Sequence, residues 1–429
     1  MTKIYIIIFL FITYIINIIK PIWGVYLYNI FLFTDPTIFA KEFFETYRPA
    51  LIAAVLLVIG TLIRGYNFSQ LKFVFSTLLL IFIVFLSILF GGGLNLILSE
   101  GKISNESLDS FISILKMVSY AIIIIWSITK RNELITLLNF ITFCSTANGL
   151  FAIYEFFHPI AERAKFTTLY RSSGFQENSN GLSVLLTISI PIAYYFFINE
   201  KNIMLKSLYL ICILSMICGI FLSISRTGLL TLVVIMGLII YKTIKKQKNT
   251  IFLFLIIIMV VSIFFITFAK KLYMERETVT TTLSGRTVYD NSTTTRLKLM
   301  KYAFQLWLYH PLLGVGLDNF RESAKNELSI KSRVVPHTAY LKLLCETGTL
   351  GFLSFIFIFI QSFKKLKHIR KKDFFYNELV DYFQIILISW CINLFFSTTI
   401  FVQIFWITIS LPFILENISI FENENSVTT

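Results

Sequence analysis

Long apolar runs recur from one end of this 429-residue chain to the other. Each run is about 16 to 24 residues long, which is enough to cross a hydrocarbon core of about 30 Å as a helix. Hydrophobic residues make up 56% of the chain and charged residues only 14%, whereas soluble domains carry about 25% charged residues. The runs do not alternate apolar and polar residues, as barrel strands do. We therefore predict an all-α polytopic membrane protein.

About twelve membrane-spanning helices are expected from these runs. The first run is expected to be a retained span, because no small-residue cleavage site follows it. A further apolar stretch at 22–33 is too short to span and is expected to be interfacial or re-entrant. The spanning runs lie at approximately 4–19, 48–63, 73–90, 111–129, 134–157, 181–198, 207–223, 227–243, 250–269, 344–363, 379–396 and 400–415.

The runs divide the chain into three segments. Residues 1–269 are expected to hold nine helices, 270–343 a large extracytoplasmic loop, and 344–429 three more helices and a cytoplasmic tail. Apolar positions at helical spacing alternate with basic residues over 293–310, which predicts an amphipathic helix at the membrane interface. Lysine and arginine in the short loops place both termini in the cytoplasm.

Three polar segments are expected on the same side of the membrane. Two spans separate Arg171 from Arg226, and two more separate Arg226 from the loop that ends near His337. An even number of crossings returns the chain to the same face. The three side chains are therefore predicted to share the extracytoplasmic face.

The two arginines have the character of anion-binding residues. Arg171 lies in the stretch RSSGFQENSNG, which leads directly into a span, and Arg226 lies in the tight turn SISRTG. Helix N-termini favour anions, and a guanidinium presents a fork that matches phosphate oxygens. The alternative for each is an interfacial arginine that snorkels to lipid headgroups.

His337 is a candidate base on the same face. It follows a loop that carries eleven Lys or Arg against six Asp or Glu between Lys270 and Arg333. The alternatives are a structural histidine and a basic loop that rests on anionic lipid. The scattered histidines and the absence of a carboxylate cluster in the outer loops predict no metal site.

Four motifs together resemble the family of O-antigen ligases and Wzy-type O-antigen polymerases, which are bacterial glycosyltransferases of GT-C architecture. In chain order they are Arg171-x-x-Gly174 with Asn178 and Asn180, then Ser225-Arg226-x-Gly228, then His310-Pro311-Leu312-x-Gly314-x-Gly316, then His337-Thr338 with Gly348 and Gly351. Thr338 departs from the family pattern, which more often has Asn, Ser or Gln there. The likeness is close over about 150–355.

The resemblance implies a metal-independent, inverting glycosyltransferase that needs no cofactor. The family uses a glycan on undecaprenyl diphosphate as donor, outside the bacterial cytoplasmic (inner) membrane. By position, Arg171 and Arg226 would bind the diphosphate and stabilise its developing charge, and His337 would deprotonate or orient the acceptor hydroxyl. Further substrate contacts are expected from Asn178, Asn180, Arg321 and Arg333.

The acceptor stays open at this point. A polymerase of O-antigen or capsular polysaccharide, which joins one lipid-linked repeat unit to another, is favoured over two alternatives. One is a ligase that transfers the glycan to the lipid A-core of lipopolysaccharide, or to protein as an O-oligosaccharyltransferase. The other is a flippase or permease for the same lipid. The expected partners are the lipid-linked donor, a glycan or lipid A-core acceptor and the bilayer, with a chain-length regulator left open and no nucleic acid.

Overall fold

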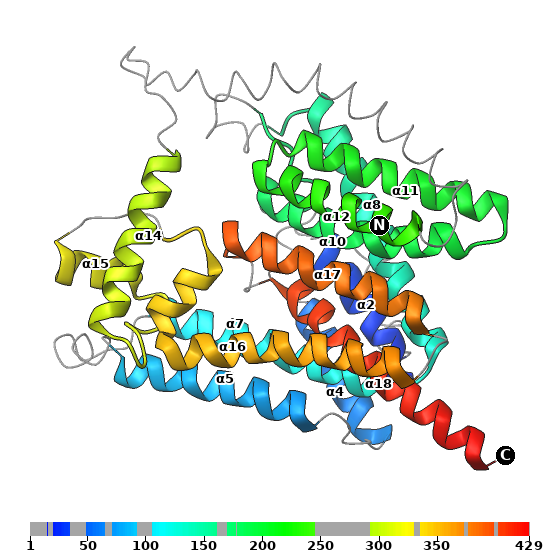
Figure 1. Cartoon of the computed structure of the whole chain (residues 1–429), viewed down its shortest axis with the longest axis horizontal. Coiled ribbons are helices and arrows are strands. Elements are labelled where there is room, and N and C mark those ends of the chain that lie inside the picture. Colours follow the sequence, from blue (N-terminus) through cyan, green and yellow to red (C-terminus); the bar gives the residue numbers. More distant parts are fainter. Residues whose placement is uncertain are drawn as a thin grey trace. The chain divides into compact units, whose positions relative to one another are not determined.

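The structure is a computed structural model of the whole chain. It describes residues 15, 20–34, 49–64, 71–91, 105–160, 170–176, 178–244, 292–329, 335–372, 376–398 and 402–428. Over these residues every regular element longer than a turn is a helix (Figure 1). The predicted all-α architecture is confirmed.

The described helices follow the apolar runs of the sequence. All predicted spans lie on them except 4–19, of which only Ile15 is described, and 250–269, which lies outside the described residues. The helices are α2 (Pro21–Thr34), α4 (Pro49–Arg64), α5 (Leu71–Phe90), α7 (Asn105–Ser127), α8 (Arg131–Phe157), α10 (Ser179–Asn199), α11 (Ile203–Leu222), α12 (Arg226–Ile244), α14 (Ser292–Tyr309), α15 (Phe320–Leu328), α16 (Ala339–Lys372), α17 (Asn377–Phe396) and α18 (Gln403–Thr428).

Within the described part of the chain, 9 helices are long and apolar enough to cross a membrane. The chain is therefore a multi-pass membrane protein, as predicted. The short apolar stretch at 22–33 forms α2, whose 14 residues give a length of about 21 Å. This is less than the thickness of a hydrocarbon core, which agrees with its exclusion from the spanning runs.

The chain forms two compact units that interleave along the sequence. Unit 1 comprises Met1–Gly60, Asn132–Asn291 and Asn377–Ser389, and unit 2 comprises Thr61–Arg131, Ser292–Tyr376 and Trp390–Thr429. The described helices of the predicted extracytoplasmic loop, α14 and α15, thus belong to the same unit as α5, α7 and α16. The division of the sequence at 270 and 343 stays a prediction.

Unit 1 is built around α10. This helix packs against α11 and α12, and most of its residues are buried inside the protein. Ser145 of α8 and Ser189 of α10 share a buried hydrogen bond of 2.7 Å. A helix that is buried on nearly all sides has a fixed N-terminus, and the polar stretch that starts at Arg171 leads into this end of α10.

Unit 2 is built around α16, which packs against α5, α14 and α18. The predicted amphipathic helix at 293–310 is confirmed as α14. Its buried side chains Leu299, Ala303 and Leu306 pack in a cluster with Phe320 and Cys345. The apolar spacing in the sequence therefore reflects packing inside the unit. A position at the membrane interface stays a prediction.

The helix α16 is interrupted at Gly348. This residue has φ 65° and ψ −172°, a region that is essentially restricted to glycine. A Cβ at Gly348 would lie 2.2 Å from the carbonyl oxygen of Leu312. The break therefore requires glycine for two reasons, the backbone conformation and the close approach of a neighbouring turn.

The turn at 311–316 forms hydrogen bonds with backbone groups that the break in α16 leaves without partners inside the helix. The N–H groups of Val315 and Gly316 donate to the carbonyls of Cys345 and Glu346 at 2.9 Å each. In the opposite direction, the N–H of Thr349 donates to the carbonyl of Pro311 at 2.8 Å. Hydrogen bonds between backbones thus connect two sequence motifs, the one beginning at His310 and the one that contains Gly348 and Gly351. We call this connection the backbone joint.

Replacing Gly348 by alanine is expected to destabilise unit 2 by about 3 kcal/mol or more, because backbone strain adds to the clash with Leu312. Gly237→Ala is the matched control. Its Cβ would meet nothing within 4 Å, and alanine in a helix interior is favoured over glycine by roughly 0.5–1 kcal/mol. Thermal melting of both purified variants in detergent checks this. A Gly348→Ala protein that melts with the Gly237→Ala protein would contradict the account.

Candidate functional site

Arg171 is held in place by backbone and side-chain acceptors of unit 1. Its Nε donates to the carbonyl oxygen of Ser223 at 3.0 Å, and its Nη2 donates to Oδ1 of Asn180 at 3.0 Å. The segment before α10 is tied to the same turn, because the N–H of Ser172 donates to the carbonyl of Leu222 at 3.2 Å. The guanidinium is half-buried and is therefore well oriented.

The same amide connects Arg171 to the turn that carries Arg226. The hydroxyl of Ser225 donates to Oδ1 of Asn180 at 3.1 Å and accepts from the N–H of Gly228 at 3.2 Å. The second bond caps the N-terminus of α12, whose first residue is the exposed Arg226. We call this group, Arg171, Asn180, Ser223, Ser225 and Arg226, the arginine corner.

The arginine corner has the chemistry of an anion site. It lies where two helices begin, α10 at Ser179 and α12 at Arg226. Each N-terminus carries partial positive charge from the helix dipole, and Arg171 and Arg226 add their own positive charges. The structure thus brings Arg171 and Asn180 into contact and holds both beside the turn that carries Arg226. Joint binding of an anion by the two arginines stays a prediction.

Asn178 caps the N-terminus of α10 in the same region. Its Oδ1 accepts from the N–H of Gly181 at 2.8 Å, which makes it the N-cap of α10. A cap of this kind contributes about 1 kcal/mol to a helix. Its side chain is exposed, and a contact with substrate stays a prediction.

His337 lies in unit 2, two residues before α16. Within the described residues its ring has no hydrogen-bond partner. Partial withdrawal of the ring from water lowers the pKa of His337 below its ordinary value, and the positive charge of Arg296 lowers this pKa further. The imidazole is therefore neutral at neutral pH and able to accept a proton.

The other predicted contact residues fall in unit 2 or outside the described chain. Arg321, in the first turn of α15, lies 4.0 Å from the carboxylate of Glu106 and is 49% exposed. Arg333 lies outside the described residues. A role for either in binding substrate stays a prediction.

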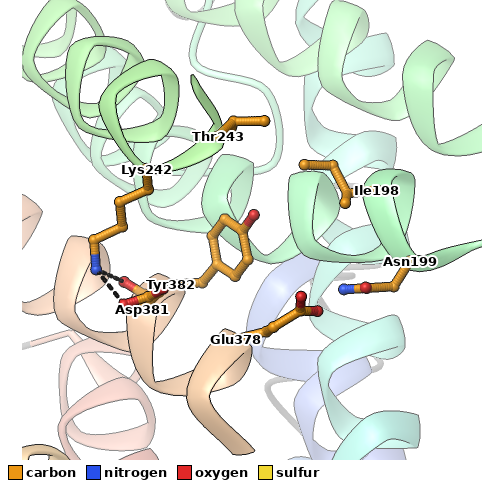
Figure 2. A pocket seen from close by; sticks show the side chains of 7 residues that line it. All are labelled: Ile198, Asn199, Lys242, Thr243, Glu378, Asp381 and Tyr382. Carbon is orange, nitrogen blue, oxygen red and sulfur yellow. Dashed lines mark hydrogen bonds and ion pairs between the residues drawn. The ribbon is translucent and has the colours of Figure 1, made fainter. Parts of the chain in front are cut away.

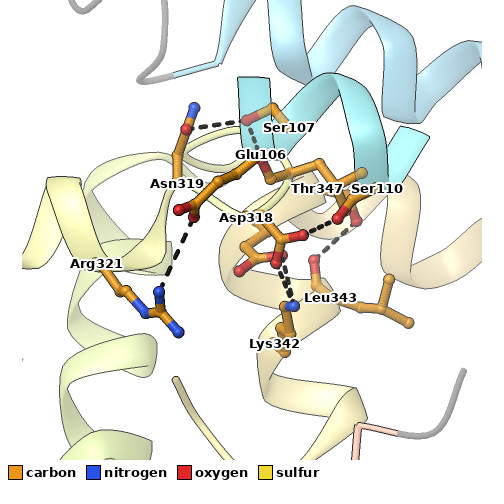
Figure 3. Close-up of polar contacts among 11 residues, drawn as sticks. Glu106, Ser107, Ser110, Asp318, Asn319, Arg321, Lys342, Leu343 and Thr347 are labelled. Carbon is orange, nitrogen blue, oxygen red and sulfur yellow. Dashed lines mark hydrogen bonds and ion pairs between the residues drawn. The ribbon is translucent and has the colours of Figure 1, made fainter. Parts of the chain in front are cut away.

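A buried polar network that the sequence motifs did not identify supports the start of α16. Asp318 accepts from Ser110 of α7 and from Lys342 of α16 (Figure 3). Glu346 is 1% exposed and lies 3.9 Å from Lys342, with no hydrogen-bond partner for either carboxyl oxygen among the described residues. Ionisable residues near the ends of apolar runs were the one signal that could have identified it.

A second polar region of unit 1 lies far from the arginine corner. Figure 2 shows a pocket lined by Lys242 at the end of α12 and by Glu378, Asp381 and Tyr382 of α17. Lys242 is paired with Asp381 at 2.7 Å. Arg226 and Lys242 are 16 positions apart on one helix, or about 24 Å at 1.5 Å per residue. The pocket and the corner are therefore at opposite ends of α12.

No group of three or more His, Cys, Asp or Glu side chains that could hold a metal ion is found in the described ranges. The side chains gathered at the arginine corner are cations, amides and hydroxyls, which suit an anionic ligand. The expectation of a metal-independent enzyme stays a prediction.

Comparison with known proteins agrees with the resemblance read from the motifs. Residues 211–356 match the family model described as O-antigen ligase. The matched range includes Arg226, the turn at 311–316, His337 and both glycines of the α16 break. No curated protein matches the chain. The predicted family relationship is confirmed for the matched range.

Replacing Arg296 by glutamine is expected to raise the pKa of His337, because a positive charge that opposes protonation is removed. Acylation by diethyl pyrocarbonate, which requires a neutral imidazole, should then fall off at a higher pH than in the wild type. Peptide mass spectrometry across pH 5 to 8 follows His337 separately from the other histidines. Lys298→Gln, on the same helix, is the control and should leave the midpoint unchanged. Equal shifts in both variants would contradict the assignment to Arg296.

Proposed function

We propose that this chain, which carries an O-antigen ligase-family domain at residues 211–356, is a glycosyltransferase of the bacterial cytoplasmic membrane. Its donor is a glycan on undecaprenyl diphosphate, and its acceptor is a sugar hydroxyl. The first candidate reaction is polymerisation, in which the acceptor belongs to a second lipid-linked repeat unit. The active side chains face the outside of the membrane.

The observation that carries this proposal is the arginine corner. Two guanidinium groups at the N-termini of two helices suit a diphosphate, which bears several negative charges and offers oxygens on all sides. Because Arg171 is already fixed by Ser223 and Asn180, little side-chain order has to be created when the donor binds. Fixed donors that face a developing charge are the strongest contribution to catalysis of this kind.

The transfer step balances without a further reactant. The acceptor oxygen forms a bond to the anomeric carbon, and the bond from that carbon to the diphosphate oxygen breaks. The electron pair leaves with undecaprenyl diphosphate, which Arg171 and Arg226 stabilise. The hydroxyl proton passes to His337, whose lowered pKa keeps it unprotonated at neutral pH. Attack from the face opposite the leaving group inverts the anomeric centre.

Transfer to lipid A-core is the second candidate function, because the matching family model carries the description O-antigen ligase. Both reactions use the same donor and the same kind of acceptor group. They differ only in the molecule that presents the hydroxyl. Transfer to protein would use the same chemistry on a serine or threonine hydroxyl.

The purified protein, supplied with an undecaprenyl-diphosphate-linked repeat unit alone and then with added lipid A-core, distinguishes the candidates. A ladder of products from the donor alone indicates a polymerase. A single product that requires lipid A-core indicates a ligase. Donor binding with no product in either mixture would count against both reactions and favour protein glycosylation or lipid transport.

His337→Ala is expected to lower kcat by about 10²–10⁴-fold, the range for loss of a general base. Arg171→Ala is expected to lower kcat/KM by about 10²–10³-fold, because a fixed donor to the leaving group is lost. His368→Ala is the control, since this exposed histidine near the far end of α16 has no role in the proposed reaction. Full activity in His337→Ala would overturn its assignment as the base.

A further inference from the structure

We propose that Glu155 is the positioning residue of the arginine corner and sets the affinity for the diphosphate through Arg171. The inference rests on the function proposed above and adds a residue that none of the motifs contains. Glu155 lies two residues before Phe157, the last residue of α8. It acts on the backbone around Arg171, and no direct contact with substrate is assigned to it.

Glu155 is a fully buried carboxylate, 0% exposed. A buried carboxylate is strongly unfavourable unless hydrogen bonds compensate for lost water. Here the compensation comes from one short segment of chain. The N–H groups of Ser173 and Gly174 both donate to Oε2 at 2.8 Å, and the Tyr170 hydroxyl donates to Oε1 at 2.6 Å.

These donors lie on both sides of Arg171 in the sequence. Tyr170 precedes the arginine, and Ser173 and Gly174 follow it within three residues. One side chain on a helix thus holds the Tyr170 hydroxyl before Arg171 and the backbone that follows Arg171. Bonds to a charged acceptor are stronger than neutral ones, so the segment is held firmly despite its lack of regular structure.

A second residue of α8, Asn148, also binds the segment that follows Arg171. Asn148 lies two turns before Glu155, and its Oδ1 accepts from the N–H of Phe175 at 3.2 Å. The backbone anchored by these two side chains then leads into α10, where Asn180 receives the Arg171 guanidinium. Arg171 is therefore fixed from both ends, by Glu155 through its backbone and by Asn180 and Ser223 through its side chain.

Four variants test this in the full-length protein in lipid nanodiscs: Glu155→Met, Glu155→Gln, Arg171→Ala and the double variant Glu155→Met/Arg171→Ala. Methionine keeps the volume but accepts no bonds of comparable strength. Glutamine keeps one strong acceptor for the two N–H groups, and its amide can donate to the Tyr170 oxygen. Glu133→Gln, on the same helix outside the corner, is the control.

The first readout is the dissociation constant for undecaprenyl diphosphate. Glu155→Met should weaken binding about tenfold, since misplacing a binding group by about 1 Å can lose up to 10²-fold. Glu155→Gln should stay within about threefold of the wild type. The double variant should bind no more weakly than Arg171→Ala, because residues that act through one another are not additive.

The second readout is hydrogen exchange of the peptide containing residues 171–176. Its amides should lose protection in Glu155→Met and keep it in Glu155→Gln. If Glu155→Met does not fold, Glu155→Asp replaces it, because the shorter carboxylate cannot reach all three donors. Weaker binding and reduced protection in that variant would support the inference.

Each failure has a distinct meaning. Lost protection with unchanged affinity would make Glu155 structural only and overturn the positioning role. Additive losses in the double variant would do the same. Equal binding by wild type and Arg171→Ala would instead overturn the proposed diphosphate site, whatever the exchange data show for Glu155.

Discussion

Buried backbone N–H and C=O groups need hydrogen-bond partners, and this requirement determines the structure around the break in α16 at Gly348. A helix interrupted inside a membrane protein exposes carbonyls and N–H groups that have no access to water. The turn at 311–316 supplies the missing partners in both directions, from Val315 and Gly316 to α16 and from Thr349 back to Pro311. Packing of α14 and α15 on this joint then fixes the segment in which His337 lies. Gly314, Gly316 and Gly348, which belong to two of the sequence motifs, are required by the backbone geometry of this break and turn.

The same principle shapes the corner in unit 1. Asn180 accepts from Arg171 and from Ser225, and Ser225 caps the first turn of α12. The turn that carries Arg226 is therefore held beside Arg171. The carboxylate of Glu155 accepts from the Tyr170 hydroxyl before Arg171 and from two backbone N–H groups after it. A site for a charged ligand can be built at low cost from groups that the fold must pair in any case. In this way a chain with few charged residues can form the anion site that the proposed function requires.

The sequence was sufficient for the class and for most spans. Apolar runs of spanning length are a direct consequence of bilayer thickness. The number of crossings predicts that Arg171 and Arg226 share one face of the membrane, and this stays a prediction. Glu155 and the network of Lys342, Asp318 and Glu346 escaped prediction, because their partners are backbone N–H groups or residues remote in the sequence. The break at Gly348 escaped for a related reason. Gly-x-x-Gly within an apolar run is equally compatible with a continuous helix, and only the turn at 311–316 makes the interruption favourable.

The proposed function depends most on binding of the donor diphosphate at the arginine corner. A cryo-electron microscopy structure of the protein with bound undecaprenyl diphosphate would test it directly. Phosphate density is expected within hydrogen-bonding distance of Arg171 and Arg226, at the N-termini of α10 and α12. Diphosphate bound instead at the pocket of Lys242 and Asp381, with no density at the corner, would contradict it.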